Sequence, residues 1–197
     1  HVFINCPFDA RYSRLFDAII FTLYFCEYKP RCALEVDDGA QNRLDKIYKI
    51  IRECDLGIHD ISRTELNPNN LPRFNMPFEL GIFLGAKQYG GKRQKTKIGL
   101  ILDIEEYRYR EFLSDIAGQD IQAHNNDPAI IIKRIRNWLN SVNNQMVLPG
   151  ATAIVKKYNE FLKQKPNILK ALHLVDEDVE YADITLIIEE WIKQNPI

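Results

Sequence analysis

Short runs of hydrophobic residues recur along the first two thirds of the chain. Runs of this length, bounded by turn-forming residues, are typical of buried β-strands. The run from 97 to 102 is almost wholly apolar, as expected of a parallel strand that is covered on both faces. The predicted strands are Val2–Asn5, Arg31–Glu35, Leu56–Asp60, Lys97–Leu102 and Ile121–His124.

Between these strands, hydrophobic residues follow the three- and four-residue spacing of amphipathic helices. Asp127-Pro128 supplies the cap and the first-turn proline of one such helix. The predicted helices are Tyr12–Phe25, a segment marked by Leu44, Ile47, Ile50 and Ile51, Pro77–Gln88, and a segment marked by Ile131, Ile135, Trp138 and Leu139. Strands that alternate with helices predict an α/β fold, with a parallel sheet of about five strands flanked by helices.

The pattern changes after residue 143, and Pro149-Gly150 sharpens the break. Beyond it only helical spacing is found, over Ala153–Lys163, Asn167–His173 and Asp183–Gln194. We therefore predict an α/β domain at residues 1–142 and a helical C-terminal extension at residues 151–197. The extension either packs on the sheet domain or forms a surface for assembly.

Charge, hydropathy and cysteine content exclude some classes of protein. The 197 residues include 26 Lys and Arg and 27 Asp and Glu, which lacks the strong basic excess of a dedicated nucleic-acid binder. No apolar run approaches the roughly 20 residues that span a bilayer, and the first residues do not resemble a signal peptide. The four cysteines form no C-x-x-C pair, so we predict reduced, mostly buried thiols in a cytoplasmic protein.

Several well-known catalytic motifs are missing. The first strand is not followed by G-x-G-x-x-G, and the chain has no P-loop, G-x-S-x-G or H-E-x-x-H sequence. These absences disfavour classical dinucleotide redox chemistry and phosphoryl transfer through a P-loop.

Polar residues instead collect where the predicted strands end. Asn5 is followed by Phe8 and Asp9, and His59-Asp60 is followed by Ser62-Arg63. Because parallel strands share a carboxyl edge, where α/β proteins bind ligands, these groups are expected to lie together.

Glu79 joins them from the helix that follows. Pro77 suits the first turn of a helix, so Glu79 is expected in that turn. There the positive end of the helix dipole favours the ionised carboxylate. Asn75 lies two residues before the proline.

Three segments resemble the TIR-like and nucleoside 2-deoxyribosyltransferase-like superfamily. They are Phe3-Ile4-Asn5-Cys6-Pro7-Phe8-Asp9, Gly57-Ile58-His59-Asp60-Ile61-Ser62 and Asn75-Met76-Pro77-Phe78-Glu79-Leu80-Gly81. The resemblance covers about residues 2–140 and implies a flavodoxin-like sheet. In one respect the chain departs from the family, because Asn75-Met76-Pro77 replaces the Ser-x-Trp-Cys pattern that precedes the glutamate in many TIR domains.

The resemblance also implies a chemistry. In TIR-type enzymes the corresponding glutamate is the catalytic residue of NAD cleavage, which makes Glu79 the candidate catalyst and NAD a substrate, with no cofactor or metal. Asn5 and Asp60 would contact ribose hydroxyls, Phe8 would pack on a base and Arg63 would contact phosphate. Asp9, Ser62 and Asn75 complete the predicted substrate-binding set. Bacterial relatives act as antiviral defence effectors that are switched on by assembly, so a homo-oligomer is expected, with residues 151–197 as a candidate interface.

Two other functions remain open. One is transfer or hydrolysis at a nucleoside or nucleotide, where the leaving base must be protonated and His59, Asp60 or His124 would have to serve. The other is a non-catalytic module that senses a nucleotide or joins partners through TIR-like contacts.

Purely structural interpretations also exist for several residues. Glu79 can be a capping residue and His59 a hydrogen-bonded core histidine. Gly81 and Gly85 are predicted to let the third helix approach the sheet closely, and residues 92–97 to form a solvated loop.

Overall fold

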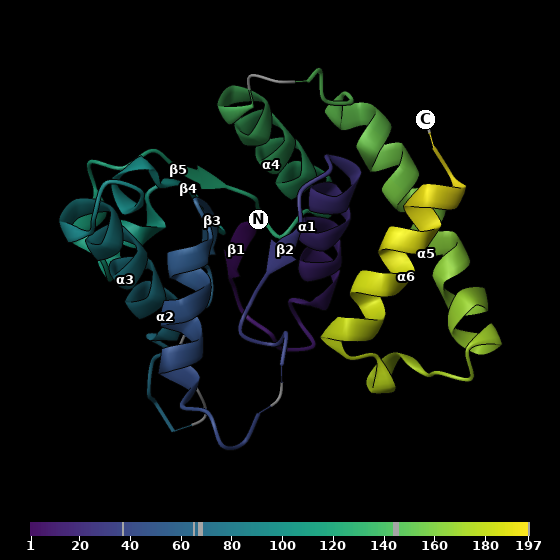
Figure 1. The fold of residues 1–197 in the computed structure, drawn as a ribbon, viewed down its shortest axis with the longest axis horizontal. Coiled ribbons are helices and arrows are strands. Elements are labelled where there is room, and N and C mark those ends of the chain that lie inside the picture. Colours follow the sequence, from purple (N-terminus) through teal and green to yellow (C-terminus); the bar gives the residue numbers. More distant parts are fainter. Residues whose placement is uncertain (37, 65, 67–68, 144–145, 197) are drawn as a thin grey trace. The chain divides into compact units, whose positions relative to one another are not determined.

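Five parallel strands pair into one sheet (Figure 1). The structure is a computed structural model, and it describes residues 1–36, 38–64, 66, 69–143 and 146–196. The strand order is β2-β1-β3-β4-β5, which is the flavodoxin-like order and confirms the predicted fold class. The strands are β1 (Val2–Asn5), β2 (Pro30–Arg31), β3 (Leu56–Asp60), β4 (Ile98–Asp103) and β5 (Ile121–Ala123).

The helices lie between the strands and after them, close to the predicted positions. They are α1 (Ser13–Phe25), α2 (Arg43–Glu53), α3 (Asn75–Tyr89), α4 (Pro128–Val142), α5 (Ala151–Ala171) and α6 (Tyr181–Gln194). Short 3₁₀ turns are η1 (Gln94–Thr96), η2 (Arg108–Glu111), η3 (Ser114–Ile116) and η4 (Asp176–Asp178). No described helix is long and apolar enough to cross a membrane.

Two predictions differ from the observed elements by more than two residues. β2 ends at Arg31 rather than at Glu35, because the Glu35 carboxylate turns back to accept hydrogen bonds from Arg31 Nε and from the Cys32 backbone N–H. The two predicted helices on either side of Pro166 are one helix, α5. Buried Phe161 and Leu169 flank the proline, and their packing maintains the helix despite the hydrogen bond that proline removes.

The chain forms two compact units. Unit 1 contains residues 1–13 and 29–127, with the whole sheet, α2 and α3. Unit 2 contains residues 14–28 and 128–197, so α1 and α4 are grouped with α5 and α6. The C-terminal helices are therefore not a unit by themselves, whereas the predicted boundary separated them from α4.

Hydrophobic packing places α2 and α3 against the sheet in unit 1. α2 begins at a cap in which Asn42 Oδ1 accepts from Leu44 N at 2.8 Å. The buried cluster joins β1, the segment after β2, α2 and α3, through Phe3, Ala33, Ile47, Ile50, Ile51, Cys54 and Phe83. This packing holds the middle of α3 against the sheet.

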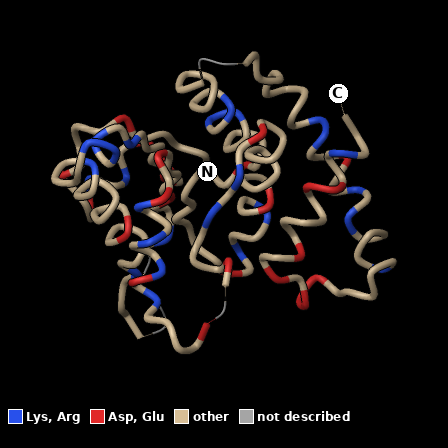
Figure 2. The backbone as a smooth tube through the Cα atoms, in the orientation of Figure 1, with Lys and Arg blue, Asp and Glu red and all other residues tan. Residues whose placement is uncertain are grey.

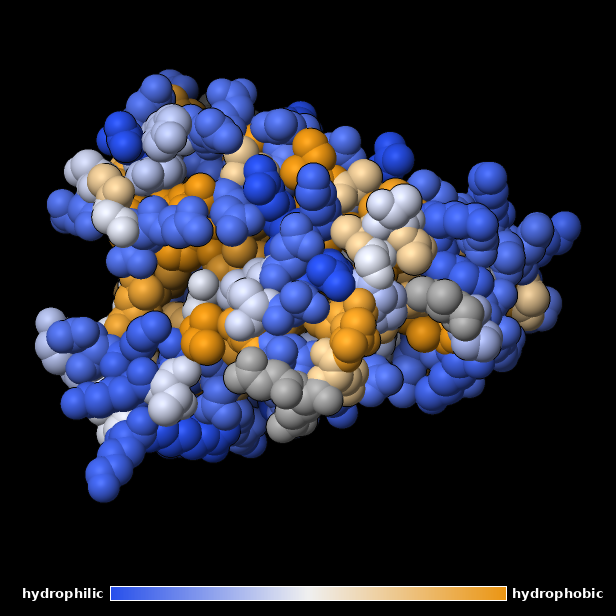
Figure 3. Space-filling view, turned by 90° about the horizontal axis from the view of Figure 1, so that it is seen from above, coloured by the Kyte–Doolittle hydropathy of each residue, from blue (hydrophilic) through white to orange (hydrophobic). Residues whose placement is uncertain are grey.

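The close approach of α3 to the sheet occurs at Gly57, which corrects the prediction for Gly81 and Gly85. A Cβ atom at Gly57 would lie 2.7 Å from the ring of Phe83, whereas one at Gly81 or Gly85 would meet no atom within 4 Å. The outer side of α3 is exposed and carries Phe74 and Phe78 at its N-terminal end and Tyr89 at its C-terminal end. Figure 3 shows hydrophobic residues that reach the surface in several places.

These two environments predict opposite effects of the same substitution. Gly57→Ala should lower the free energy of unfolding by about 1–3 kcal/mol, because the added methyl overpacks the core. Gly81→Ala should raise it by about 0.5–1 kcal/mol, because alanine favours an exposed helix and meets no atoms there. Urea unfolding followed by circular dichroism measures both. Equal effects at the two positions would contradict the close approach at Gly57.

Lys97 corrects the prediction of a solvated loop at residues 92–97. Its side chain is fully buried, and Nζ donates to the carbonyls of Ile51 and Cys54 at the end of α2. A cation at this position complements the negative end of the α2 dipole, although burial lowers the Lys97 pKa. The lysine therefore serves the fold.

Unit 2 has an aromatic core of its own. Phe21 of α1 contacts Tyr158, Phe161 and Trp191, and Tyr158 OH donates to the Arg14 carbonyl at 2.8 Å. Lys165 and Asp17 form an ion pair at 2.9 Å. All four cysteines of the chain are free and buried, as predicted.

Candidate functional site

The candidate site lies at the carboxyl ends of β1 and β3. These neighbouring strands are the point at which the strand order reverses, and flavodoxin-like folds bind ligands there. Asn5, the last residue of β1, donates from Nδ2 to the Met76 carbonyl at 2.8 Å and lies 3.2 Å from His59 Nδ1. Its amide thus ties the first turn of α3 to the ends of both strands. Asn5 is buried, so the structure gives it a positioning role, and a substrate contact stays a prediction.

Glu79 lies one turn further along α3, which corrects its predicted place in the first turn. The helix begins at Asn75, so Pro77 is its third residue and Glu79 its fifth. Proline is tolerated there because the first N–H groups of a helix have no intrahelical partner. Asn75 itself is exposed at the helix start.

The electrostatic environment of Glu79 also differs from the expectation of a fully ionised carboxylate. The residue is only 8% exposed and makes no hydrogen bond or ion pair with the residues that the structure describes. Burial raises its pKa from 4.5 to about 7, and the charge of Arg43 opposes this shift only in part. Burial therefore dominates the shift, and both protonation states are populated at neutral pH.

Asp60 ends β3 and is fully buried. Its Oδ2 accepts from Tyr12 OH and lies 3.1 Å from His124 Nε2, and its Oδ1 accepts from Ser62 N at 2.8 Å. Burial alone would raise the Asp60 pKa, but the interactions with His124, Ser62 and Tyr12 outweigh it and lower the pKa. Both oxygens are thus engaged inside the fold, where the prediction placed a contact to ribose.

His124 is oriented toward Asp60 by its other nitrogen. Nδ1 accepts from the Asn126 backbone N–H at 3.0 Å, and Nε2 lies 3.1 Å from the Asp60 carboxylate. Sequence reasoning named His124 only as a candidate acid and did not find Tyr12. Neither partner is close to Asp60 in sequence, so no local motif indicates this cluster.

His59 fits its structural interpretation. It is fully buried between the rings of Phe3 and Phe83, and burial lowers its pKa to about 3. A ring that stays neutral down to this pH cannot protonate a leaving base at pH 7.

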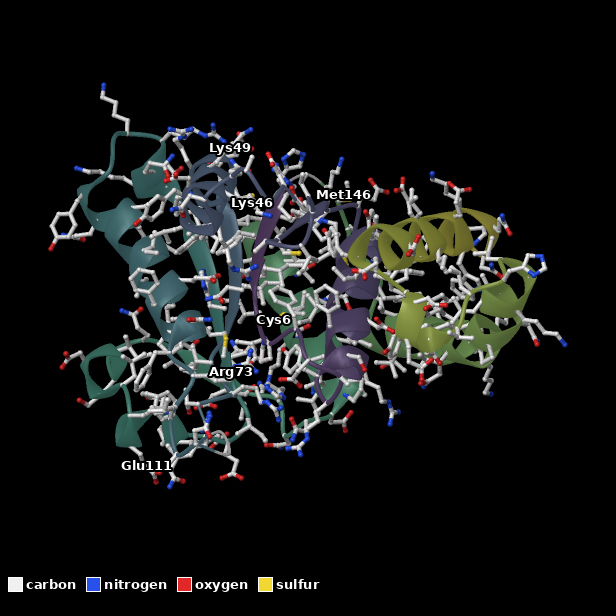
Figure 4. The ribbon with its side chains drawn as sticks, turned by 90° about the horizontal axis from the view of Figure 1, so that it is seen from below. Cys6, Lys46, Lys49, Arg73, Glu111 and Met146 are labelled. Carbon is white, nitrogen blue, oxygen red and sulfur yellow. The ribbon has the colours of Figure 1, made fainter. Side chains whose placement is uncertain are left out.

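Asp9 brings two arginines together beside these strand ends. Arg63 Nη2 donates to both of its oxygens, at 3.0 and 3.1 Å, and Arg73 Nη1 donates to Oδ2 at 3.0 Å. Arg63 lies in the connection after β3 and Arg73 just before α3. Figure 4 labels Arg73 and Cys6 in the same part of the molecule.

The remaining predicted residues differ in accessibility. Phe8 is partly buried. Ser62 is buried, and its Oγ has no hydrogen-bond partner among the described residues.

Arg108 is a residue that the sequence analysis missed. It donates to Asp103 at the end of β4, to the Ile61 carbonyl at 3.1 Å and to Thr64 Oγ1 at 3.1 Å. These bonds hold the segment after β3 that carries Ser62 and Arg63. Only the contact to Asp103, five residues away, is local enough to suggest a pairing from sequence.

Within the described part of the chain, no group of three or more His, Cys, Asp or Glu side chains could hold a metal ion. Basic and acidic residues are interspersed along the chain (Figure 2). No protein-family model matches the sequence, and a search of curated proteins finds no match. The resemblance to the TIR-like and deoxyribosyltransferase-like superfamily therefore stays a prediction from three short motifs.

Proposed function

We propose that this chain hydrolyses the N-glycosidic bond between nicotinamide and ribose in NAD, and that Glu79 is the catalytic residue. One observation supports this most strongly. Glu79 is a mostly buried carboxyl group without a hydrogen-bond or ion-pair partner among the described residues, on the helix that Asn5 fixes at the strand ends. A desolvated, unpaired carboxylate at the strand-order reversal of a flavodoxin-like sheet is a candidate functional group on physical grounds.

The chemistry requires only one such group. When the C–N bond breaks, its electron pair leaves with nicotinamide, which is cationic in NAD and neutral as a product. Positive charge grows on the ribose, and the Glu79 carboxylate stabilises it. A water molecule then adds to the sugar carbon and loses a proton, for which ionised Glu79 is an acceptor.

The candidate acids are poorly placed for the alternative of purine release. His59 has a pKa of about 3, and Asp60 is fully buried with its pKa lowered. His124 is fully buried against Asp60. This favours a substrate whose leaving group needs no proton.

Cleavage of a nucleoside or nucleotide is a second candidate function, and one observation supports it. A Glu79 pKa of about 7 leaves a large fraction of the carboxyl protonated at neutral pH, so Glu79 itself could donate a proton to a leaving base. In that reaction the protonated form would be the active one.

The pH dependence of turnover separates the two candidates. For NAD cleavage, kcat/KM should rise with pH, with a midpoint near 7, and fall about tenfold per pH unit below about pH 6. Nicotinamide release from NAD and base release from a nucleoside panel, measured by chromatography at high protein concentration, provide the data. Activity on nucleosides that falls as the pH rises through 7 would support the second candidate. Nucleotide binding without turnover would contradict both and leave the non-catalytic module.

The proposed setting is the cytosol of a bacterium, where a self-assembled form of the chain would deplete NAD as an antiviral defence effector. The resemblance to TIR-like proteins is the support for this setting. The free, buried cysteines agree with a reducing compartment.

A further inference from the structure

We propose that Arg63 and Arg73 form a binding site for the diphosphate of a nucleotide, and that the Asp9 carboxylate occupies this site until the ligand displaces it. This inference rests on the proposed function for its place in catalysis. The binding itself does not depend on turnover.

Convergence of the two guanidinium groups is the first observation. They reach one carboxylate from two points of the β3–α3 connection, with three N–O distances of 3.0 to 3.1 Å. Asp9 lies in the connection after β1 and also accepts from the Arg11 backbone N–H at 3.1 Å. The charges are therefore organised around a single point occupied by an anion.

Charge and exposure give the second observation. The two guanidinium groups that contact the Asp9 carboxylate are both cations at neutral pH. The side chains are 22% exposed for Arg63, 44% for Arg73 and 29% for Asp9, so the group is open to solvent. Ion pairs with this degree of exposure contribute little to stability, so a stronger anion can replace Asp9 without disturbing the fold.

The chemistry of the ligand follows from the arginines. A planar guanidinium binds carboxylate and phosphate oxygens through the same paired hydrogen bonds. A diphosphate offers more acceptor oxygens and more negative charge than one carboxylate, and so can satisfy both arginines at once. A nucleotide with a single phosphate should bind less tightly, and a nucleoside should gain nothing from the site.

The position of this group relative to Glu79 is the third observation. Cys6, the residue after β1, is electrostatically coupled to both Asp9 and Glu79, and these charges add to the effect of burial that raises its pKa. Arg73 also lies two residues before the start of α3, whose fifth residue is Glu79. The arginine pair and Glu79 are thus both near the end of β1.

Equilibrium binding measured by calorimetry tests the inference, with inorganic pyrophosphate, ADP-ribose, AMP and adenosine as the probes. Asp9→Asn removes the competing charge and should tighten pyrophosphate and ADP-ribose binding by about three- to tenfold. The double variant Arg63→Gln/Arg73→Gln should lose pyrophosphate binding. Arg52→Gln, which changes an exposed arginine on α2, is the matched control and should bind as the wild type does.

Pyrophosphate binding that is unchanged or weaker in Asp9→Asn would overturn the inference, as would undiminished binding by the double variant. Circular dichroism of each variant checks the fold. If Asp9→Asn is misfolded, the affinities of the wild type for the three adenosine compounds test the inference instead. ADP-ribose should bind most tightly, AMP less tightly and adenosine least. Equal affinity for the three would overturn the inference. If this chain binds a diphosphate but does not cleave NAD, the proposed function is refuted, whereas the proposed diphosphate site is supported.

Discussion

Replacing Glu79 by glutamine should reduce nicotinamide release from NAD by about 10²- to 10³-fold, the loss typical for removal of one group that stabilises transition-state charge. Glutamine keeps the size of the side chain but cannot carry the negative charge that faces the developing cation. The loss should appear mainly in kcat, because the interaction strengthens as the bond breaks.

The same substitution should stabilise the protein at neutral to alkaline pH. A carboxyl whose pKa is raised from 4.5 to about 7 on folding destabilises the native state above pH 7, and this effect vanishes below about pH 4.5. Glu79→Gln should therefore raise the free energy of unfolding at pH 8 by about 1–3 kcal/mol and leave it unchanged at pH 4. A gain in stability with a loss of activity is the signature of a functional residue. If Glu79 only capped the helix, the substitution would lower stability and leave activity unchanged.

The exposed Glu111 of η2 provides the control (Figure 4). Glu111→Gln makes the same chemical change and should leave both turnover and stability close to the wild type. Full NAD cleavage by Glu79→Gln would refute the assigned catalytic role.

The second large effect is expected at Asp60. Asp60→Asn should lower the free energy of unfolding by about 2–5 kcal/mol, because it removes a buried charge that Tyr12, Ser62 and His124 all contact. The amide group of asparagine would also place a second donor against Tyr12 OH or His124 Nε2. Urea unfolding at pH 7 measures the change, with the exposed Asp120→Asn as control, for which less than about 0.5 kcal/mol is expected.

The pH dependence has the opposite sign from that of Glu79. Because the Asp60 pKa is lowered in the fold, its stabilising contribution is present above the ordinary value of 3.8 and is lost as the pH falls through the folded value. The difference between Asp60→Asn and the wild type should therefore shrink in strong acid. An Asp60→Asn variant with wild-type stability and impaired NAD binding would instead support the predicted ribose contact.

The fold could be predicted because its signals are local. Short apolar runs predicted the strands, and the helical spacing between them predicted that strands and helices alternate along the chain. The near-continuous apolar run in β4 indicated a doubly covered parallel strand. The glutamate of α3 could be named as a candidate because it follows a strand and a helix-starting proline.

What could not be predicted depends on contacts between distant residues. The Glu79 pKa reflects burial by the packed fold, whereas the sequence showed only the helix dipole. Asp60 was assigned to substrate because its partners Tyr12 and His124 come from other segments. Gly57 rather than Gly81 allows close packing because Phe83 of α3 is directed at β3, which spacing within α3 does not indicate.

The central claim is that the ionised form of Glu79 acts on the glycosidic bond. The most direct measurement is a carbon-13 NMR titration of the Glu79 carboxyl in the wild type, with its signal identified by its absence from Glu79→Gln. We predict a midpoint near pH 7 that coincides with the rise of nicotinamide release from NAD. A midpoint near the ordinary value of 4.5, or a release rate that does not follow the ionisation of Glu79, would contradict the claim.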